Sequence, residues 1–506
     1  MVCICPFLSL VPGRRDYVIG EASIAAIPFR SVLKHVPPGS GHNLQKEPED
    51  MIAPEGNISN RGKGLLEKLN PNAAGIDIGS KEHYVAVPPD PGERAVRKFG
   101  CFTEDLHRMA RWLGECGVQK VAMESTGVYW IPVFEVLEGH GFEVSLVDAR
   151  QVKNVPGRKT DVLDCQWLQE LHTFGLLRGC FRPAGEVAVV RAYWRQRRQL
   201  VQSASRQILL MQKALEQMNV QLHKVVSDIS GVTGMSIIRE IVGGERDPKK
   251  LAENRAHGVK ASQHTIAAAL EGNWREEHVF ALKQAVELYD VFQGKIAECD
   301  EKVRECLRGC EQKGDPGDLA DGGKAGRGRR KNQPYFDLRA ELYRMTGVDL
   351  TAIDGIDAMT AMTILAECGS DLSMFASEKE YASWLCLAPN NRITGGKIKS
   401  RKTRKSANRS ADALRLAAQS LHSSQSALGA FYRRMRARLG PAKAVTATAH
   451  KLACLIYRML RYGMEYVDQG QDYYNEQYRQ RVVKNLSRQA TRLGFLLVSV
   501  GTGEVS

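Results

Sequence analysis

The spacing of hydrophobic residues changes along the chain and divides it into segments of different structure. From residue 73, short apolar runs alternate with amphipathic stretches, which predicts strands and helices in turn. The amphipathic stretches 104–116 and 130–139 read as helices. Five runs read as strands: AAGIDIGS, HYVAV, VRKFGCF, VQKVAMES and FEVSLVD. We therefore expect an α/β sheet domain over residues 73–183, whose first three strands form a meander.

Beyond residue 183 the apolar residues follow alternating steps of three and four, the spacing of a coiled coil. Two long helices with such seams either fold back on each other or pair between subunits. A coiled-coil domain over 184–312 and a homo-oligomer, dimer or tetramer, are the expectations. One seam consists of Leu200, Ala204, Ile208, Met211, Leu215, Met218, Leu222, Val225 and Ile229. The other consists of Leu282, Ala285, Tyr289, Phe292, Ile296, Cys299, Val303, Cys306 and Cys310.

Glycine-rich and polar stretches mark the boundaries of a further domain. The stretch GDPGDLADGGKAGRGRRKNQP predicts a flexible linker over 313–334, followed by a helical domain over 335–468. That domain begins with LTAIDGIDAMTAMTILAECG, which reads as a helix-hairpin-helix or as an ordinary helical hairpin. In the first case the turn amides would receive a phosphate. Residues 1–72 lack sustained periodicity and predict a poorly ordered extension, and residues 469–506 form a tail.

The charge of the chain favours a polyanionic partner. Lys and Arg number 71 against 57 Asp and Glu, a formal net charge of +14, and nucleic acid is the simplest polyanion. The 12 cysteines form no CxxC pair and predict reduced thiols in a cytoplasmic protein. No apolar run is long enough for a membrane span, so no membrane partner is expected.

Four acids stand at positions where catalytic carboxylates are found. Asp77 interrupts the first apolar strand and Glu124 ends the fourth, so both belong to the edge where sites form in α/β sheets. Asp161 and Asp164 are three residues apart and share one helix face. Carboxylate oxygens suit Mg²⁺, and two such ions promote phosphodiester cleavage. As alternatives, the acids are solvated surface groups, and Asp161 and Asp164 cap a helix.

A basic segment without acidic residues spans 381–411. Uncompensated like charges repel one another in a folded domain, so a phosphate-contacting surface is expected, with a solvated face as the alternative. Its basic residues are Arg392, Lys397, Lys399, Arg401, Lys402, Arg404, Lys405 and Arg409.

At these residues the sequence resembles the DEDD transposases of the insertion sequence 110 family, especially the insertion sequence 1111 branch. The resemblance covers most of residues 73–468 and is weak in the coiled coil and the linker. It is carried by GIDIGSKEH, MESTGVYW, KTDVLDCQWLQELHTFGLL, LCLAPNNRITGGK and KTRKSANRSADALRLAAQSL.

The resemblance implies a RuvC-like, RNase-H-type fold whose catalytic tetrad is Asp77, Glu124, Asp161 and Asp164. It further implies that a second domain supplies a serine nucleophile and that a structured guide RNA recognises donor and target DNA. The position of that serine in NNRITGGKIK is Thr394, with Ser400 and Ser406 as the other candidates and a plain turn residue as the alternative. The extra methyl group of threonine crowds attack at phosphorus.

The expected activity is therefore that of a recombinase that moves an insertion element. Two other functions use the same residues. A RuvC-like structure-specific nuclease needs the four acids but no hydroxyl nucleophile, and an inactive remnant binds nucleic acid through the basic segment alone.

Overall fold

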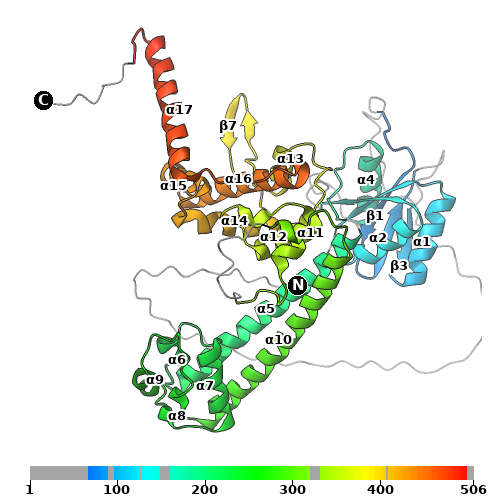
Figure 1. The fold of residues 1–506 in the computed structure, drawn as a ribbon. Helices are drawn as coiled ribbons and strands as arrows, with labels where there is room; N and C mark the ends of the chain where they lie inside the picture. The colour runs from blue at the N-terminus through cyan, green and yellow to red at the C-terminus, as the bar shows by residue number, and fades with distance from the viewer. Residues whose placement is uncertain are drawn as a thin grey trace, which may run out of the picture. The chain divides into compact units, whose positions relative to one another are not determined.

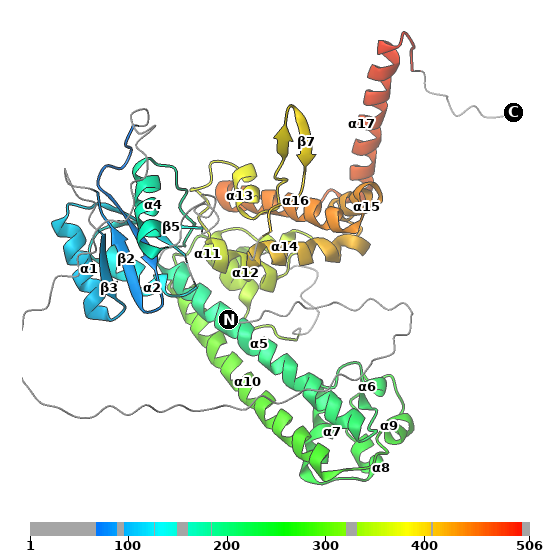
Figure 2. The same cartoon turned by 180° about the vertical axis from the view of Figure 1, so that it is seen from behind.

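The computed structural model describes residues 67–88, 96–125, 127–148, 160–183, 185–319, 331–405 and 408–497. These residues belong to two compact units, one that ends at Cys180 and one that begins at Phe181 (Figures 1 and 2). The predicted extension 1–72 lies almost wholly outside the described residues. The predicted linker 313–334 and tail 469–506 lie partly outside them.

The first unit contains a five-stranded mixed sheet in the order β3-β2-β1-β4-β5. β1, β2 and β3 form an antiparallel meander, and β4 and β5 continue from β1 in parallel. All five strands expected from the sequence are present, which confirms the α/β part of the predicted fold class. Their bounds are β1 Ala73–Ile78, β2 Glu82–Ala86, β3 Val96–Gly100, β4 Lys120–Glu124 and β5 Glu143–Val147.

Helices cover both faces of this sheet. α1 (Thr103–Glu115) and α2 (Trp130–Gly139) bury Leu106, Met109, Leu113 and Phe134 against one face. α4 (Asp161–Thr173) covers the other face, where its Leu168 packs on Ala122 and Val147. Thr160 caps α4, since its Oγ1 accepts a hydrogen bond from Leu163 N at 3.4 Å. Asp161 and Asp164 therefore lie in the first turn without being its cap.

The second unit begins with a helical hairpin formed by α5 (Glu186–Gln217) and α10 (Glu276–Gly309) (Figure 1). Arg197 and Asp300 form a buried ion pair between the two helices. The seams thus meet within one chain, and a coiled coil as such is not confirmed. The first seam was also expected to run to Ile229, whereas α5 ends at Gln217 and the chain turns at Asn219, whose φ is +61°.

A group of short helices, called the helical cap below, packs on the end of the α5–α10 hairpin where α5 ends and α10 begins. It contains α6 (Leu222–Val225), α7 (Val232–Gly243), α8 (Pro248–Ala252) and α9 (Gln263–Ala269). The seam residues beyond α5 are buried in the core of this cap and not in a continued helix pair. That core contains Leu222, Val226, Ile229, Ile238, Leu251 and Leu282.

The remaining helices pack on the other end of the α5–α10 hairpin, where α5 begins and α10 ends. Val190 and Trp194 of α5 and Val303 and Leu307 of α10 share one core with the C-terminal helices, so hairpin and C-terminal helices form one unit. The helices are α11 (Leu338–Thr346), α12 (Ala358–Cys368), α13 (Glu378–Trp384), α14 (Arg409–Ser420), α15 (Ala427–Leu439), α16 (Pro441–Tyr462) and α17 (Gly470–Arg492). Single 3-10 turns occur at Pro316–Asp318, Leu350–Ala352 and Leu421–Ser423.

The turn read as a possible helix-hairpin-helix joins a 3-10 turn to α12. Gly355 has a φ of +89°, and a Cβ at this residue would lie 2.9 Å from the carbonyl oxygen of Ala417. Asp357 caps α12 by accepting a hydrogen bond from Thr360 N at 2.8 Å. A protein carboxylate thus satisfies one backbone amide at this helix N-terminus.

Among the described segments, no helix combines the length and the hydropathy that crossing a membrane requires.

Candidate functional site

Strand register brings two of the four acids side by side. In the parallel pair of β1 and β4, Gly75 is opposite Ala122 and Ile76 is opposite Met123. Continuing this register places Asp77 opposite Glu124, where each strand reaches its carboxyl end. Both belong to the face covered by α4, because side chains alternate along a strand and Ile76 and Met123 pack on the other face.

The other two acids reach this edge because α4 lies directly on β1. Gly75 makes that approach possible: a Cβ there would lie 2.3 Å from Gln169 N and 2.4 Å from the Cys165 carbonyl oxygen. The first turn of α4, with Asp161 and Asp164, consequently lies above the end of β1. Only glycine allows this backbone contact, so a residue without a side chain determines where two carboxylates stand.

The pKa of Asp77 is raised by its burial and by the three other acids near it. Burial raises it first, and the negative charges of Asp161, Asp164 and Glu124 raise it further, from an ordinary 3.8 to about 6. Asp77 is half-buried, Glu124 and Asp164 are half-buried as well, and Asp161 is exposed. The four acids predicted from the sequence are thus brought into one electrostatic cluster.

Cys165 is a neighbour of this cluster that the sequence analysis did not select. It is fully buried, its Sγ donates to the Val162 carbonyl oxygen at 3.1 Å, and burial together with Asp77 raises the pKa of the thiol to about 12. It is therefore a neutral packing group beneath the acids. Gly75 was also not selected, although a glycine within an apolar strand pattern is an indicator of close backbone approach.

The donor set fits a divalent cation in its chemistry. Four carboxylates supply the hard oxygen ligands that Mg²⁺ and similar ions prefer, and a cation would offset the mutual repulsion that raises the pKa of Asp77. Within the described segments, however, no three His, Cys, Asp or Glu side chains already stand in coordinating positions. The acids would have to converge further around a bound ion.

Thr394 lies in the second unit, at the tip of an exposed β-hairpin (Figure 1). The hairpin consists of β6 (Arg392–Thr394) and β7 (Lys397–Ser400), joined by Gly395 and Gly396 with φ of +54° and +71°. Two positive φ angles at the centre of a two-residue loop are typical of a type I′ turn. Thr394 pairs with Lys397 across this turn and is an exposed residue.

The two serines named as other candidates differ in what the structure describes. Ser400 lies at the base of the hairpin, where its Oγ accepts a hydrogen bond from Lys402 N at 3.3 Å. Ser406 lies outside the described residues.

The basic residues of segment 381–411 divide into two groups, those with partners in the protein and those that, among the described residues, have no acidic partner. Arg404 donates to the Ser383 carbonyl oxygen at 2.7 Å, Lys405 has interactions of its own, and Arg409 lies 3.8 Å from Glu367. In the part of the chain that the structure describes, five others are exposed and have no acidic partner: Arg392, Lys397, Lys399, Arg401 and Lys402. These five form the free basic surface around Thr394.

Two family models match parts of the chain. Residues 74–220 match the insertion sequence 110 DEDD model, described as a transposase, and residues 349–433 match the model of the Transposase IS116/IS110/IS902 family. No curated protein matches the chain. The first match contains the α/β unit with its four acids, and the second contains the Thr394 hairpin.

Fold, site and matches together define a transposase, a class of enzyme that cleaves and rejoins DNA. Both matches support an insertion sequence 110 family DEDD transposase. DNA is accordingly a partner of this protein, and DEDD transposases generally depend on a divalent metal ion.

Proposed function

We propose that this transposase moves an insertion element by a RuvC-like, carboxylate-dependent mechanism in which Thr394 is the nucleophile and a structured RNA guides target choice. The observation that carries the proposal is the environment of Asp77, whose pKa is raised first by burial and then by three further acids from the neighbouring strand and from α4. Carboxylates concentrated at a sheet edge serve phosphoryl transfer when they hold cations.

The four acids would act as ligands and not as proton donors. Asp77, Glu124, Asp161 and Asp164 would hold two Mg²⁺ ions, which when bound would withdraw charge from the phosphate and stabilise the leaving oxygen. Asp77 must be ionised for this role, and above a pH of about 6 it is. Asp161 and Asp164 stand in the first turn of α4, at the positive end of its dipole.

Thr394 would provide the oxygen that attacks phosphorus. Its Oγ1 loses a proton and forms the new bond to phosphorus, the bond from phosphorus to the DNA oxygen breaks, and that oxygen takes up a proton. Lys397, across the turn, supplies a positive charge beside the phosphate. Rejoining is the reverse step with a different DNA end. The proposal requires that Thr394 and the four acids act on the same phosphate.

The free basic surface supports a polyanion as the partner of the second unit. Arg392, Lys397 and Lys399 extend from the hairpin, and Arg401 and Lys402 follow it directly. Backbone phosphates of DNA or of a guide RNA satisfy such side chains equally, and the guide RNA itself rests on the family resemblance. Self-association is the remaining part of the proposal. It rests on exposed apolar side chains of the helical hairpin of α5 and α10, among them Leu209 and Val291.

A covalent protein–DNA adduct is the decisive test of the proposed mechanism. Purified protein incubated with element-end DNA and Mg²⁺ should form an adduct that survives denaturing electrophoresis. Thr394→Ala should abolish the adduct while DNA binding remains, and Thr394→Ser should retain or increase it because it keeps the hydroxyl and removes the methyl group. Asp77→Asn should abolish cleavage, whereas Glu115→Gln, the same kind of change at an exposed site of the same unit, should not.

Each alternative predicts a different result in this experiment. Cleavage without any adduct is the behaviour of a structure-specific nuclease. Binding without cleavage in the presence of Mg²⁺ is the behaviour of an inactive remnant. An adduct that persists in Thr394→Ala would assign the nucleophile to another hydroxyl, and Ser400 and Ser406 are the next positions to change.

A further inference from the structure

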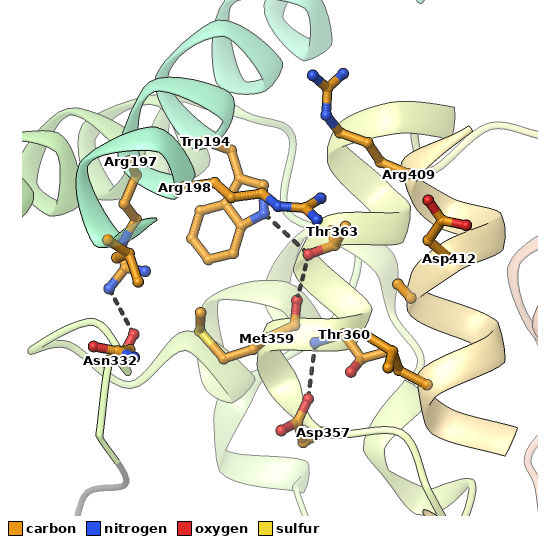
Figure 3. Close-up of a pocket in the computed structure, with 13 residues that line it drawn as sticks. Trp194, Arg197, Arg198, Asn332, Asp357, Met359, Thr360, Thr363, Arg409 and Asp412 are labelled. Atoms are coloured by element: carbon orange, nitrogen blue, oxygen red, sulfur yellow. Dashed lines mark hydrogen bonds between the residues drawn. The ribbon is translucent and has the colours of Figure 1, made fainter. Parts of the chain in front are cut away.

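A cavity of about 310 Å³ lies in the second unit between α5, α12 and α14, and the proposed mechanism does not use it (Figure 3). Its volume is at the lower end of the range of about 300–1,000 Å³ found for small-ligand pockets. Trp194, Val201, Met359 and Leu416 give it apolar walls. Leu416 is 68% exposed, so apolar surface stands open to solvent here.

The cavity is built from side chains whose positions are fixed. Trp194 Nε1 donates to Thr363 Oγ1 at 3.1 Å, and Thr363 Oγ1 donates in turn to the Met359 carbonyl oxygen at 2.8 Å (Figure 3). The guanidinium of Arg197 lies 5.2 Å from the Trp194 ring centre and also donates to the Asn332 carbonyl oxygen at 2.9 Å. A preformed wall of this kind lowers the entropy lost on binding.

Positive charge surrounds the opening. Figure 3 shows Arg198 reaching from α5 across the cavity toward α12, with Arg409 on the α14 wall. Arg198 is exposed and, in the described part of the chain, has no acidic partner. Arg195 and Arg191 stand about one and two helical turns before Arg198 on α5.

The acids near these arginines are already engaged. Glu367 accepts two hydrogen bonds from Arg195, Asp357 caps α12, and Asp412 pairs with Arg415 at 2.8 Å. Burial and neighbouring arginines lower the pKa of both Arg191 and Arg409. The local charge is therefore positive in excess, and a bound anion would relieve it.

An apolar cavity has the chemistry to bind a base together with its phosphate when it lies beside Arg198, which is exposed, and Arg409, which shares Glu367 with Arg195. Bases stacked inside a duplex cannot enter a concave site, whereas an unpaired base can leave the stack at a cost of a few kcal/mol. The geometry points to this cavity as a binding site for one unstacked nucleotide of a nucleic acid, with the base against Trp194, Met359 and Leu416 and its phosphate on Arg198 and Arg409. This inference rests on the proposed function, because it deepens the account of the nucleic-acid partner.

The test compares two duplexes of equal length, one fully paired and one with a single unpaired nucleotide. Binding of the full-length protein is measured by fluorescence anisotropy, once with DNA and once with RNA duplexes, so that the two arms identify the source of the nucleotide. We expect the protein to prefer the unpaired-nucleotide duplex by about tenfold in at least one arm. A pocket that only attracts phosphate charge would bind the paired and the unpaired-nucleotide duplexes equally well, with DNA and with RNA.

Matched variants connect the preference to the cavity. Arg198→Ala removes the unpaired arginine, and Ala413→Phe fills the cavity from α14. Both should bring the ratio close to one. Arg206→Ala is the control, since Arg206 is an exposed arginine on the same helix that does not line the cavity. Leu416→Glu and Leu416→Lys form a second pair at one exposed wall position, and only the negative charge should reduce the preference.

The outcomes separate this inference from the proposed function. A ratio of one for the unmodified protein in both arms overturns the nucleotide site, even if the Thr394 adduct forms. An equal loss of preference in Arg198→Ala and Arg206→Ala also overturns it. A clear preference without any adduct supports the nucleotide site and counts against recombination alone.

Discussion

Asp77 stands in an environment that favours its protonated form. It is half-buried at the end of β1, with Glu124 on the adjacent strand and two acids in the first turn of α4. A cation reverses the effect of these neighbours, because they then attract the same ion. Metal binding at this site would therefore be coupled to proton release from Asp77.

Metal affinity should depend on pH through this residue. Below its pKa of about 6, Asp77 holds a proton that Mg²⁺ must displace, so affinity should fall by about tenfold for each pH unit. Isothermal titration calorimetry between pH 5 and pH 8 measures this directly. Asp77→Asn should remove the pH dependence along with most of the affinity. An affinity that stays constant from pH 5 to pH 7 would contradict the assignment of Asp77 as a ligand.

The stability of the metal-free protein should change in the opposite direction. The folded pKa of Asp77 lies above its ordinary 3.8, so its favourable contribution to folding is complete below pH 3.8 and is lost as the pH rises through about 6. Because the group is partly exposed, solvent screening reduces the effect to about 1 kcal/mol. Asp77→Asn should therefore raise the unfolding temperature of metal-free protein at pH 8 but not at pH 4. Equal shifts at both values would refute this.

Gly75 should be intolerant of the smallest side chain. In Gly75→Ala the new Cβ would meet the backbone of α4, which cannot move without displacing Asp161 and Asp164. We expect a loss of about 1–3 kcal/mol in unfolding free energy and a loss of cleavage. Gly114→Ala is the matched control, because nothing lies within 4 Å of a Cβ at Gly114 in α1. It should be neutral or stabilising by up to about 1 kcal/mol. Thermal unfolding and a cleavage assay distinguish the two variants.

Among the elements, the β6–β7 hairpin and the two residues that follow it carry the free basic surface. Neutralising Lys397, Lys399, Arg401 and Lys402 should weaken nucleic-acid binding and reduce the slope of log affinity against log salt by about 0.9 for each duplex phosphate that these side chains neutralise. Arg404 is left unchanged because it supports the Ser383 backbone. Neutralising Lys295 and Lys302, which pair with Glu298 and Glu305 on α10, is the control. An unchanged slope would remove the hairpin from the interface.

The elements also show what periodicity can and cannot predict. The strands followed from runs such as AAGIDIGS because a buried strand needs continuous apolar residues, and the ends of those runs located Asp77 and Glu124. The end of α5 did not follow, because Leu222 and Ile229 keep the helical spacing after the chain has turned at Asn219. Burial alone sets that spacing, whether the residues face a partner helix or the core of the cap. The position of α4 above Asp77 depends on contacts of Gly75 that a one-dimensional pattern does not contain.

At the scale of the whole molecule, the packing of the α5–α10 helical hairpin decides which residues can test self-association. Leu215 and Leu222 are 1% and 0% exposed within the cap core, so charges there would unfold the cap and not merely separate subunits. Leu209 of α5 and Val291 of α10 are 67% and 57% exposed. Leu209→Lys with Val291→Lys should lower the mass measured by light scattering without lowering the unfolding temperature. Gln202→Lys is the control, and an unchanged mass would exclude these positions from an interface.

The length of α5 has a consequence for any substrate that contacts both of its ends. Its 32 residues correspond to a rod of about 48 Å, the rise of roughly 14 base pairs of B-form DNA. Since α10 runs beside it and separate cores fix the two ends, the rod has no freedom to shorten. Removing seven residues from each helix would keep the facing side chains nearly in phase and bring the ends about 10 Å closer. The number of helical turns in α5 and α10 therefore sets the distance between the two ends of this helical hairpin.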